Sequence, residues 1–247
     1  MENKPKNYLN DEHLSIGTRE YLRVLNAGGR PVESLPVAEA RKVLADVQAA
    51  VEVDLSGIDE REREIVADGH ALTLHLVRPH GSRGRLPYFV FIHGGGWVLG
   101  DYPTHRRLIR DLVVESEVAA VFVDYTPSPE AKYPQAVDEI YAAVKWVAEN
   151  DAELDLDRRR MALVGNSAGG NMALAAALLA KKRHAPAVRA LVLLWPVTSA
   201  SSDWKSYALY GGERFLTAPL MKWMFDRYTT DARAREEILL SPVNASR

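Results

Sequence analysis

The sequence predicts an α/β fold with a mostly parallel central sheet and helices on both faces. Short, continuous apolar runs have the length of strands that are buried on both sides. Helical patterns lie between these runs, and such alternation is typical of a parallel sheet. The expected strands are 88–92, 118–123, 161–164 and 190–195, and the clearest helices between them are 136–147 and 168–182.

The remaining elements flank this alternation. Residues 10–52 have helical spacing in two stretches that Pro31 and Pro36 separate. Residues 63–67 and 72–77 alternate between apolar and polar side chains around Asp68-Gly69, which predicts a β-hairpin. After the last apolar run the pattern is helical again over 215–228, and residues 241–244 are loop-like.

Composition limits what the chain does. Its 247 residues are 47% hydrophobic, enough for one globular domain with a full core. A net charge of -2 gives no basic surface for nucleic acid or anionic lipid, so a small molecule is the expected partner. The chain has no cysteine, which excludes disulfides and thiolate nucleophiles. No cofactor, metal or membrane span is expected, because no ligand cluster and no run of about 20 apolar residues occurs. The N-terminus has no apolar signal segment, so we expect a cytoplasmic location.

The strongest chemical signal is Gly165-Asn166-Ser167-Ala168-Gly169, between the expected strand 161–164 and the following helix. G-x-S-x-G at a strand-to-helix turn is a nucleophile elbow, in which small residues permit a tight turn that exposes the serine hydroxyl. By composition alone, such a string occurs in roughly one chain in ten of this size. Its placement after a buried strand makes Ser167 the candidate catalytic nucleophile.

A second signal, His93-Gly94-Gly95-Gly96-Trp97, follows the expected strand 88–92 at the same carboxyl edge of the sheet. Consecutive glycines let backbone N–H groups turn toward one point, as the oxyanion of ester hydrolysis requires. An isolated Gly-Gly-Gly would be interpreted as a plain turn. Paired with the elbow, this segment is a candidate oxyanion loop, in which His93 supports the backbone.

These motifs, with Val123-Asp124-Tyr125 and Tyr133-Pro134, resemble the hormone-sensitive-lipase-like (bacterial family IV) carboxylesterases of the α/β-hydrolase fold. The resemblance implies an oxyanion hole made by the glycines of the loop and the amide of Ala168. It also implies a helical cap, formed by the N-terminal helices and the region 204–228, over the acyl pocket. The candidate oxyanion residues are Gly94, Gly95, Gly96 and Ala168, and the candidate pocket residues are Trp97, Tyr125, Asn166, Phe215, Met221 and Met224.

Two alternatives stay open for the aromatic and methionine-rich stretch 215–228: core packing, or a cap helix whose inner face contacts the acyl chain. The chain departs from the resembling family in two places. Asn166 stands where the family usually has Asp, and we expect it to brace the turn by hydrogen bonding without the charge. The family's acid and histidine follow the serine by roughly a hundred residues or more, whereas only 80 residues follow Ser167, so both are expected outside this chain.

The histidines within the chain are poor substitutes for that base. His184 ends the helix that begins at the elbow and should lie about 25 Å from Ser167. His93 belongs to the oxyanion loop, and His105 is a weak candidate because no acid is expected to orient it. The other four, which lie on the preamble and the hairpin, are expected to be surface or packing residues: His13, His70, His75 and His80.

We therefore expect a serine carboxylesterase that hydrolyses short- to medium-chain acyl esters through an acyl-enzyme on Ser167. The isolated chain is expected to be inactive, since a triad cannot assemble in it. A receptor-like binding protein and an amidase or acyltransferase are the alternatives. The expected organisation is a cap segment (1–52), the hydrolase core (53–200), a cap helix insertion (201–235) and the start of a C-terminal part whose strands are missing (236–247). An exposed apolar edge at 190–195 should then be covered by the missing C-terminal segment or by a homo-oligomer partner.

Overall fold

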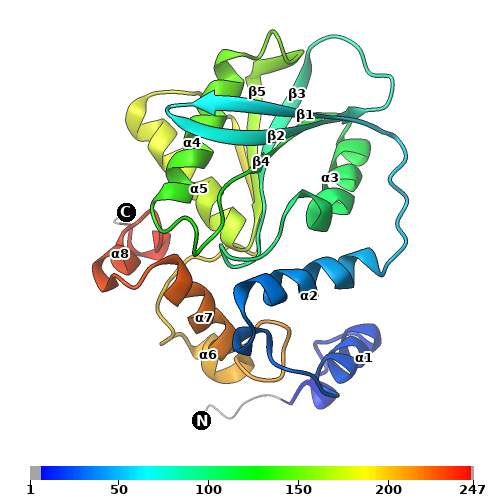
Figure 1. Cartoon of the computed structure of the whole chain (residues 1–247), viewed down its shortest axis with the longest axis vertical. Helices are drawn as coiled ribbons and strands as arrows, with labels where there is room; N and C mark the ends of the chain where they lie inside the picture. Colours follow the sequence, from blue (N-terminus) through cyan, green and yellow to red (C-terminus); the bar gives the residue numbers. More distant parts are fainter. Residues whose placement is uncertain (1–6, 246–247) are drawn as a thin grey trace.

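A computed structural model describes residues 7–245 as a sheet with helices on both faces (Figure 1). The strand order is β1-β2-β4-β3-β5-β6, with β3 parallel to β4 and β5, and β5 parallel to β6. This confirms the predicted α/β class, and the order is that of a mostly parallel sheet with an antiparallel hairpin at one side. The strands are β1 (Ile58–Ala67), β2 (His70–Pro79), β3 (Leu86–Ile92), β4 (Ala119–Asp124), β5 (Leu156–Asn166) and β6 (Ala190–Leu194).

The predicted hairpin is β1 and β2, joined by Asp68 and Gly69. Both turn residues have positive φ angles, 48° and 87°, as a two-residue hairpin turn requires. Alternate side chains of β2, such as Leu74 and Leu76, are buried, which explains the period-2 pattern in the sequence. The two strands are longer than their apolar alternation predicted, because exposed charged residues continue β1.

Three helices cover the two faces of the sheet. On one face α3 (Tyr102–Ser116) packs against the aromatic side chains of the central strands. On the other face α4 (Gln135–Glu149) and α5 (Ala168–Arg183) bury the aliphatic side chains of the same strands. Successive residues of a central strand therefore enter opposite cores, and this makes the apolar runs continuous. The α3 side contains Phe89, Phe91, Phe122, Ile109 and Val113, and the α4 and α5 side contains Val90, Ile92, Val121, Leu163 and Ala176.

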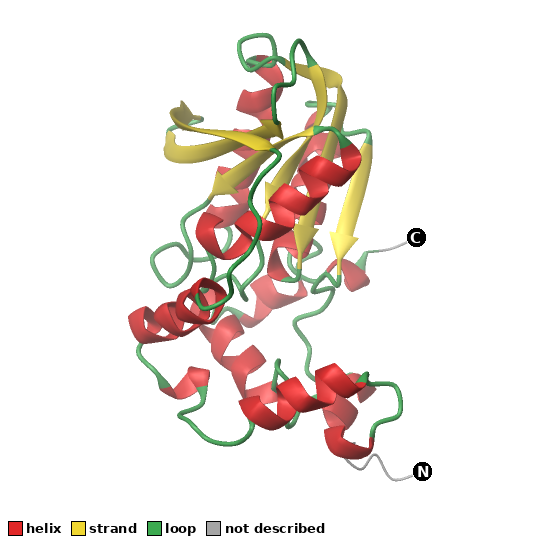
Figure 2. Ribbon diagram, turned by 90° about the vertical axis from the view of Figure 1, so that its right-hand side faces the viewer, coloured by secondary structure: helices red, strands yellow, loops and turns green. Residues whose placement is uncertain are grey.

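The other helices gather beyond the carboxyl ends of the parallel strands, as the strand arrows in Figure 2 make visible. Two helices in the preamble confirm the helical interpretation of 10–52. The pattern at 215–228 contains a helix, but it begins at residue 218 because Thr217 caps it by accepting the N–H of Leu220. These elements are α1 (Ile16–Leu25), α2 (Val37–Ala49), α6 (Lys205–Tyr210), α7 (Ala218–Tyr228) and α8 (Ala232–Glu236), with short 3-10 turns at Tyr8–Asn10, Val32–Ser34 and Pro242–Asn244. Among residues 7–245, no helix combines the length and the apolar character that a membrane crossing needs.

Helix α2 is tied to the loops at the carboxyl edge by one side chain. The Arg41 guanidinium donates to the carbonyl oxygens of Val98 and Ser128 at 2.8 and 2.9 Å, and it pairs with Glu130 at 2.7 Å. Each of these partners lies in a loop that follows a central strand. The preamble is thus fixed to the edge of the sheet where the sequence motifs lie.

Strand β6 forms the far edge of the sheet. Within residues 7–245 no strand pairs with its outer side, and Leu191 and Val192 are 38% and 44% exposed. The strand ends at Leu194, one residue earlier than expected, because Trp195 turns out of the sheet with a φ of 41°. What covers this edge stays a prediction.

Candidate active site

Ser167 lies at the turn between β5 and α5, in a conformation that few non-glycine residues adopt. Its φ and ψ angles are 54° and −122°. Its N–H donates to the carbonyl of Leu194 at 2.9 Å, and its carbonyl accepts the N–H groups of Asn171 and Val197 at 3.1 and 3.2 Å. Strain of this kind persists only where surrounding contacts determine it fully, and it is common at functional sites.

The glycines around Ser167 are required by close contacts between main chains. A Cβ at Gly169 would lie 2.1 Å from the carbonyl oxygen of Ile92, at the end of β3. A Cβ at Gly165 would lie 2.5 Å from the carbonyl oxygen of Gly169, across the turn. Neither contact leaves room for a side chain, so the G-x-S-x-G spacing follows from the packing of the elbow on β3.

The loop 93–97 leaves β3 beside the elbow, since β3 and β5 are neighbours and Ile92 aligns with Gly165. Gly95 and Gly96 have φ angles of 115° and 62°. A Cβ at Gly95 would lie 2.0 Å from the carbonyl oxygen of Leu99, and one at Gly96 would lie 2.0 Å from the Met224 Sδ. The loop is therefore compressed between its own return segment and helix α7.

Three backbone N–H groups near Ser167 have no partner in the main-chain network. Outside the regular helices and strands, no backbone hydrogen bond within 7–245 uses the N–H of Gly95, Gly96 or Ala168. Such donors at the start of a helix and in a glycine loop can receive a developing negative charge. Gly94 differs from the sequence expectation, because its N–H donates to the Asn166 Oδ1 at 2.8 Å and is already engaged.

His93 is buried and braces the loop from below. Its ring stacks on Tyr125 at a centroid distance of 4.2 Å, and the Tyr125 hydroxyl donates to the His93 carbonyl at 3.0 Å. Its Nδ1 lies 2.8 Å from the Gly94 carbonyl oxygen and donates to it. Burial, with the nearby His105, lowers the pKa of His93 to about 3, so the ring is neutral at physiological pH.

A pocket of about 620 Å³ opens at Ser167, a volume within the range of small-molecule sites. Its wall comes from the segment after β6, from α6, from the start of α7 and from Val243. Of the pocket residues expected from the sequence, Met221 lines it. The other lining residues are Trp195, Pro196, Val197, Thr198, Ser199, Trp204, Ser206, Tyr207, Tyr210, Gly211, Leu216, Thr217 and Ala218.

The remaining expected pocket residues lie elsewhere. Trp97 is buried and stacks on Tyr228 at 4.7 Å, while Met224 packs on Gly96. Tyr125 lies under His93, and Asn166 points at the oxyanion loop. The side chains of Trp97 and Met224 pack the loop against α7, which supports core packing for that face of the helix. Contact of the face that carries Met221 with an acyl chain stays a prediction. Phe215 lines a separate cavity.

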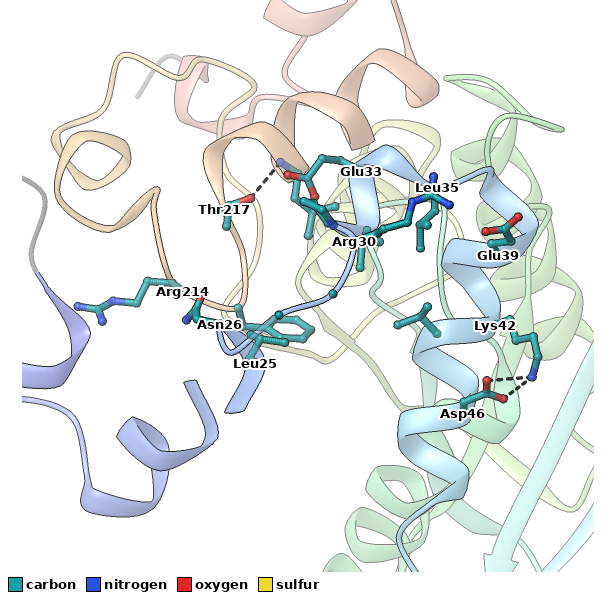
Figure 3. Close-up of a pocket in the computed structure, with 17 residues that line it drawn as sticks. Leu25, Asn26, Arg30, Glu33, Leu35, Glu39, Lys42, Asp46, Arg214 and Thr217 are labelled. Carbon is teal, nitrogen blue, oxygen red and sulfur yellow. Dashed lines mark hydrogen bonds and ion pairs between the residues drawn. The ribbon is translucent and has the colours of Figure 1, made fainter. Parts of the chain in front are cut away.

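That second cavity, of about 850 Å³, lies between the α1–α2 connection and the segment 214–220 (Figure 3). It shares Thr217 with the serine pocket but does not include Ser167. Lys42 and Asp46 on its rim are paired with each other at 2.7 Å. Its lining contains no serine and no histidine.

All seven histidines lie within the described residues, and none lines the serine pocket. His184 caps the distant end of α5, as expected. His105 is held by the Asp101 carbonyl at 3.2 Å and by Asn166 at 3.4 Å. Among residues 7–245 no group of three or more His, Asp or Glu side chains could hold a metal ion.

Sequence reasoning missed most of the pocket wall. Trp195, Tyr207 and Tyr210 reach the pocket from segments that carry no motif. One available signal was position: Trp195 follows the strand that neighbours the elbow, and the carboxyl ends of parallel strands meet at one edge. The residues of α6 carried no such signal.

Comparison with known proteins gives consistent matches. A family model described as alpha/beta hydrolase fold matches residues 89–247. The chain is 32% identical over 221 residues to a putative alpha/beta hydrolase of Acanthamoeba polyphaga mimivirus, which covers 88% of this chain and 62% of that protein. It is 31% identical over 236 residues to the ethyl acetate hydrolase of Pseudomonas putida, covering 92% of this chain and 74% of that one.

A solved structure is also similar. It is a thermostable esterase from Pseudomonas putida ECU1011, with 52% identity and a TM-score of 0.94. The match covers 96% of this chain and 75% of the esterase. The chain therefore spans 62% to 75% of the length of these three proteins.

Proposed function

Because the chain belongs to the hormone-sensitive-lipase-like family of the α/β-hydrolase fold, we propose that Ser167 is the nucleophile of a serine carboxylesterase. The proposal rests on a strained, half-buried serine that lines a pocket, next to a turn and a loop whose N–H groups no main-chain hydrogen bond uses. A protein that only binds a ligand has no need of either feature. This favours an enzyme over the receptor-like alternative.

In the proposed reaction the Ser167 Oγ attacks the carbonyl carbon of an ester. The carbonyl oxygen becomes an oxyanion and accepts hydrogen bonds from the N–H groups of Gly95, Gly96 and Ala168. The tetrahedral intermediate collapses, the alcohol leaves with a proton, and an acyl group remains on Ser167. Water then attacks the acyl carbon and releases the carboxylic acid.

The general base of this scheme is a histidine that is not among the seven of this chain. The proposal rests on the observation that no histidine of the chain lines the serine pocket. The relatives are longer than this chain, and we assign the base and its orienting acid to the part of them that has no counterpart here. In the same proposal, that part covers the open edge of β6; a second copy of the chain is the alternative cover.

The substrates proposed are esters with short- to medium-length acyl chains. A pocket of about 620 Å³ lined by Trp195, Tyr207 and Met221 offers apolar surface for such a chain. The name of the Pseudomonas putida relative, ethyl acetate hydrolase, agrees with small esters. A solved variant of an esterase 52% identical to this chain has a serine replaced by alanine and a tryptophan 28 positions later replaced by histidine. Trp195 stands at that same spacing from Ser167.

Two further parts of the proposal concern organisation. We assign 1–52 and 201–235 to a cap over the hydrolase core, supported by the position of α1, α2, α6 and α7 beyond the strand ends (Figure 1). Limited proteolysis tests the division, with first cuts expected between core and cap. The cytoplasmic location stays a prediction from the sequence, which cell fractionation would test.

The test of function compares two forms. One is the 247-residue chain, for which we expect little hydrolysis of p-nitrophenyl acetate. The other is a fusion, called here the completed chain. It joins the 247-residue chain to the part of the Pseudomonas putida ECU1011 esterase that this chain lacks. We expect the completed chain to be active, insensitive to EDTA, and slowed about 10⁴-fold or more by Ser167→Ala. Ser199→Ala, on the same pocket wall, is the matched control. If activity survived Ser167→Ala, Ser167 would not be the nucleophile.

A further inference from the structure

Asn166 lies immediately before the nucleophile and connects three segments through its side-chain amide. Its Oδ1 accepts the N–H of Gly94 at 2.8 Å, and its Nδ2 lies 3.4 Å from the His105 Nε2. Gly94 begins the oxyanion loop, and His105 is on α3. Since Gly94 is the first glycine of the loop, the position of the free donors that follow it depends on this contact.

The proton positions in this network follow from the partners of His105. Its Nδ1 lies 3.2 Å from the Asp101 carbonyl oxygen, which can only accept. It also lies 3.1 Å from the Thr104 Oγ1, whose single proton is used on the same carbonyl at 2.9 Å. Nδ1 therefore carries the proton, and Nε2 of the neutral ring has a free lone pair. That lone pair faces the amide of Asn166, which donates to it.

The surroundings of His105 favour the neutral ring. Burial lowers its pKa, and the hydrogen bond and charge of Asp101 oppose this only in part. The other titratable group against it is His93, whose ring lies 5.3 Å away and is itself neutral. The apolar rings of Phe91 and Phe122 and the backbone of Gly100 also lie next to it.

We propose that Asn166 is a positioning residue that joins the oxyanion loop to an uncharged His105, so that the loop keeps its geometry over the neutral pH range. In this chain an amide matches both partners, because its oxygen accepts from Gly94 while its nitrogen donates to the neutral His105. A carboxylate at position 166 could accept from Gly94, but its second oxygen would face a lone pair unless His105 bound a proton. The effect on catalysis rests on the function proposed for Ser167. The hydrogen-bond network is independent of that function.

The first test is an NMR titration of the histidine side chains in the 247-residue chain, with His105 assigned by the signals that His105→Gln removes. We expect the tautomer with a proton on Nδ1 and a bare Nε2 at pH 7. In Asn166→Asp the new carboxylate should raise the pKa of His105 by at least about one unit. Asn150→Asp, at the end of α4, is the control and should leave it unchanged. A proton on Nε2 in the native chain, or an unchanged pKa in Asn166→Asp, overturns the proposal.

The second test follows the hydrolysis rate of Asn166→Asp relative to the native residue, both in the completed chain, from pH 5 to 9. The ratio cancels the pH dependence of the base. Below the raised pKa of His105 the imidazolium pairs with the carboxylate that the substitution introduces, and the ratio is highest. As pH rises through that pKa, His105 loses the proton and the carboxylate loses its hydrogen bond to His105. The oxyanion loop is then no longer joined to α3, and the ratio should fall about tenfold or more.

A rescue variant distinguishes this from a simple structural defect. With His105→Gln added to Asn166→Asp, the glutamine amide can donate to the carboxylate at every pH, and the ratio should become flat. A ratio that is flat in Asn166→Asp alone would contradict the proposal. If Ser167→Ala kept its activity while the NMR results stood, the proposed function would fail and the role of Asn166 in the network would survive.

Discussion

The elbow and the candidate oxyanion loop are held by close main-chain contacts and by buried side chains, whereas the wall of the Ser167 pocket includes exposed side chains from distant segments. At Gly95 and Gly169 a single Cβ would lie 2.0 and 2.1 Å from a carbonyl oxygen. In the wall, Trp195 is 70% exposed and Trp204 is 49% exposed, so each has room to change. We therefore expect the elbow and the loop to tolerate almost no substitution, whereas the pocket wall, and with it the choice of substrate, can vary.

The largest loss of activity is expected from Gly95→Val in the completed chain. A side chain there would meet the Leu99 carbonyl and force a φ of 115° on a β-branched residue, so the loop must move. We expect kcat to fall about 10²-fold or more for every ester, with KM little changed. Gly212→Val, at a glycine with open space around it, is the control. A folded Gly95→Val enzyme with native kcat would place the oxyanion hole elsewhere.

A smaller effect is expected at the pocket wall. Trp195→Ala removes a ring that lines the pocket and is 70% exposed. The ratio of kcat/KM for p-nitrophenyl octanoate to that for the acetate should change by about tenfold. A partly exposed contact lies at the low end of the roughly 1–3 kcal/mol that pocket contacts contribute. The kcat for the acetate should stay near the native value. An equal loss of kcat/KM for both esters would mean that Trp195 supports the catalytic geometry and does not select the substrate. The contrast drawn between the elbow and the pocket wall would then be wrong.

The parts predicted from the sequence are those that local chemistry determines. The strand runs, the hairpin at Asp68-Gly69 and the placement of Ser167 and Gly95 at one edge follow from apolar length, turn residues and motif position. Such signals lie within a few residues of the feature they predict. The two candidate catalytic loops could therefore be located without any structure.

The pocket wall could not be predicted in this way, because its residues are chosen by tertiary packing. Trp97 and Met224 are residue types that often line pockets, yet both are buried. Trp97 of the loop packs on α7, and Met224 of α7 packs on the loop. Gly94 looks like a third oxyanion donor, yet Asn166 uses its N–H. Nothing near these residues in the sequence indicates which neighbour they meet across the fold.

An inhibitor adduct would show whether Ser167 and three main-chain N–H groups form one catalytic centre. A crystal structure of the completed chain treated with a p-nitrophenyl alkylphosphonate should show phosphorus bonded to the Ser167 Oγ. The phosphoryl oxygen should lie about 2.7–3.1 Å from the N atoms of Gly95, Gly96 and Ala168, with the alkyl group toward Met221. An adduct on another residue, or a phosphoryl oxygen directed away from these three atoms, would contradict the account.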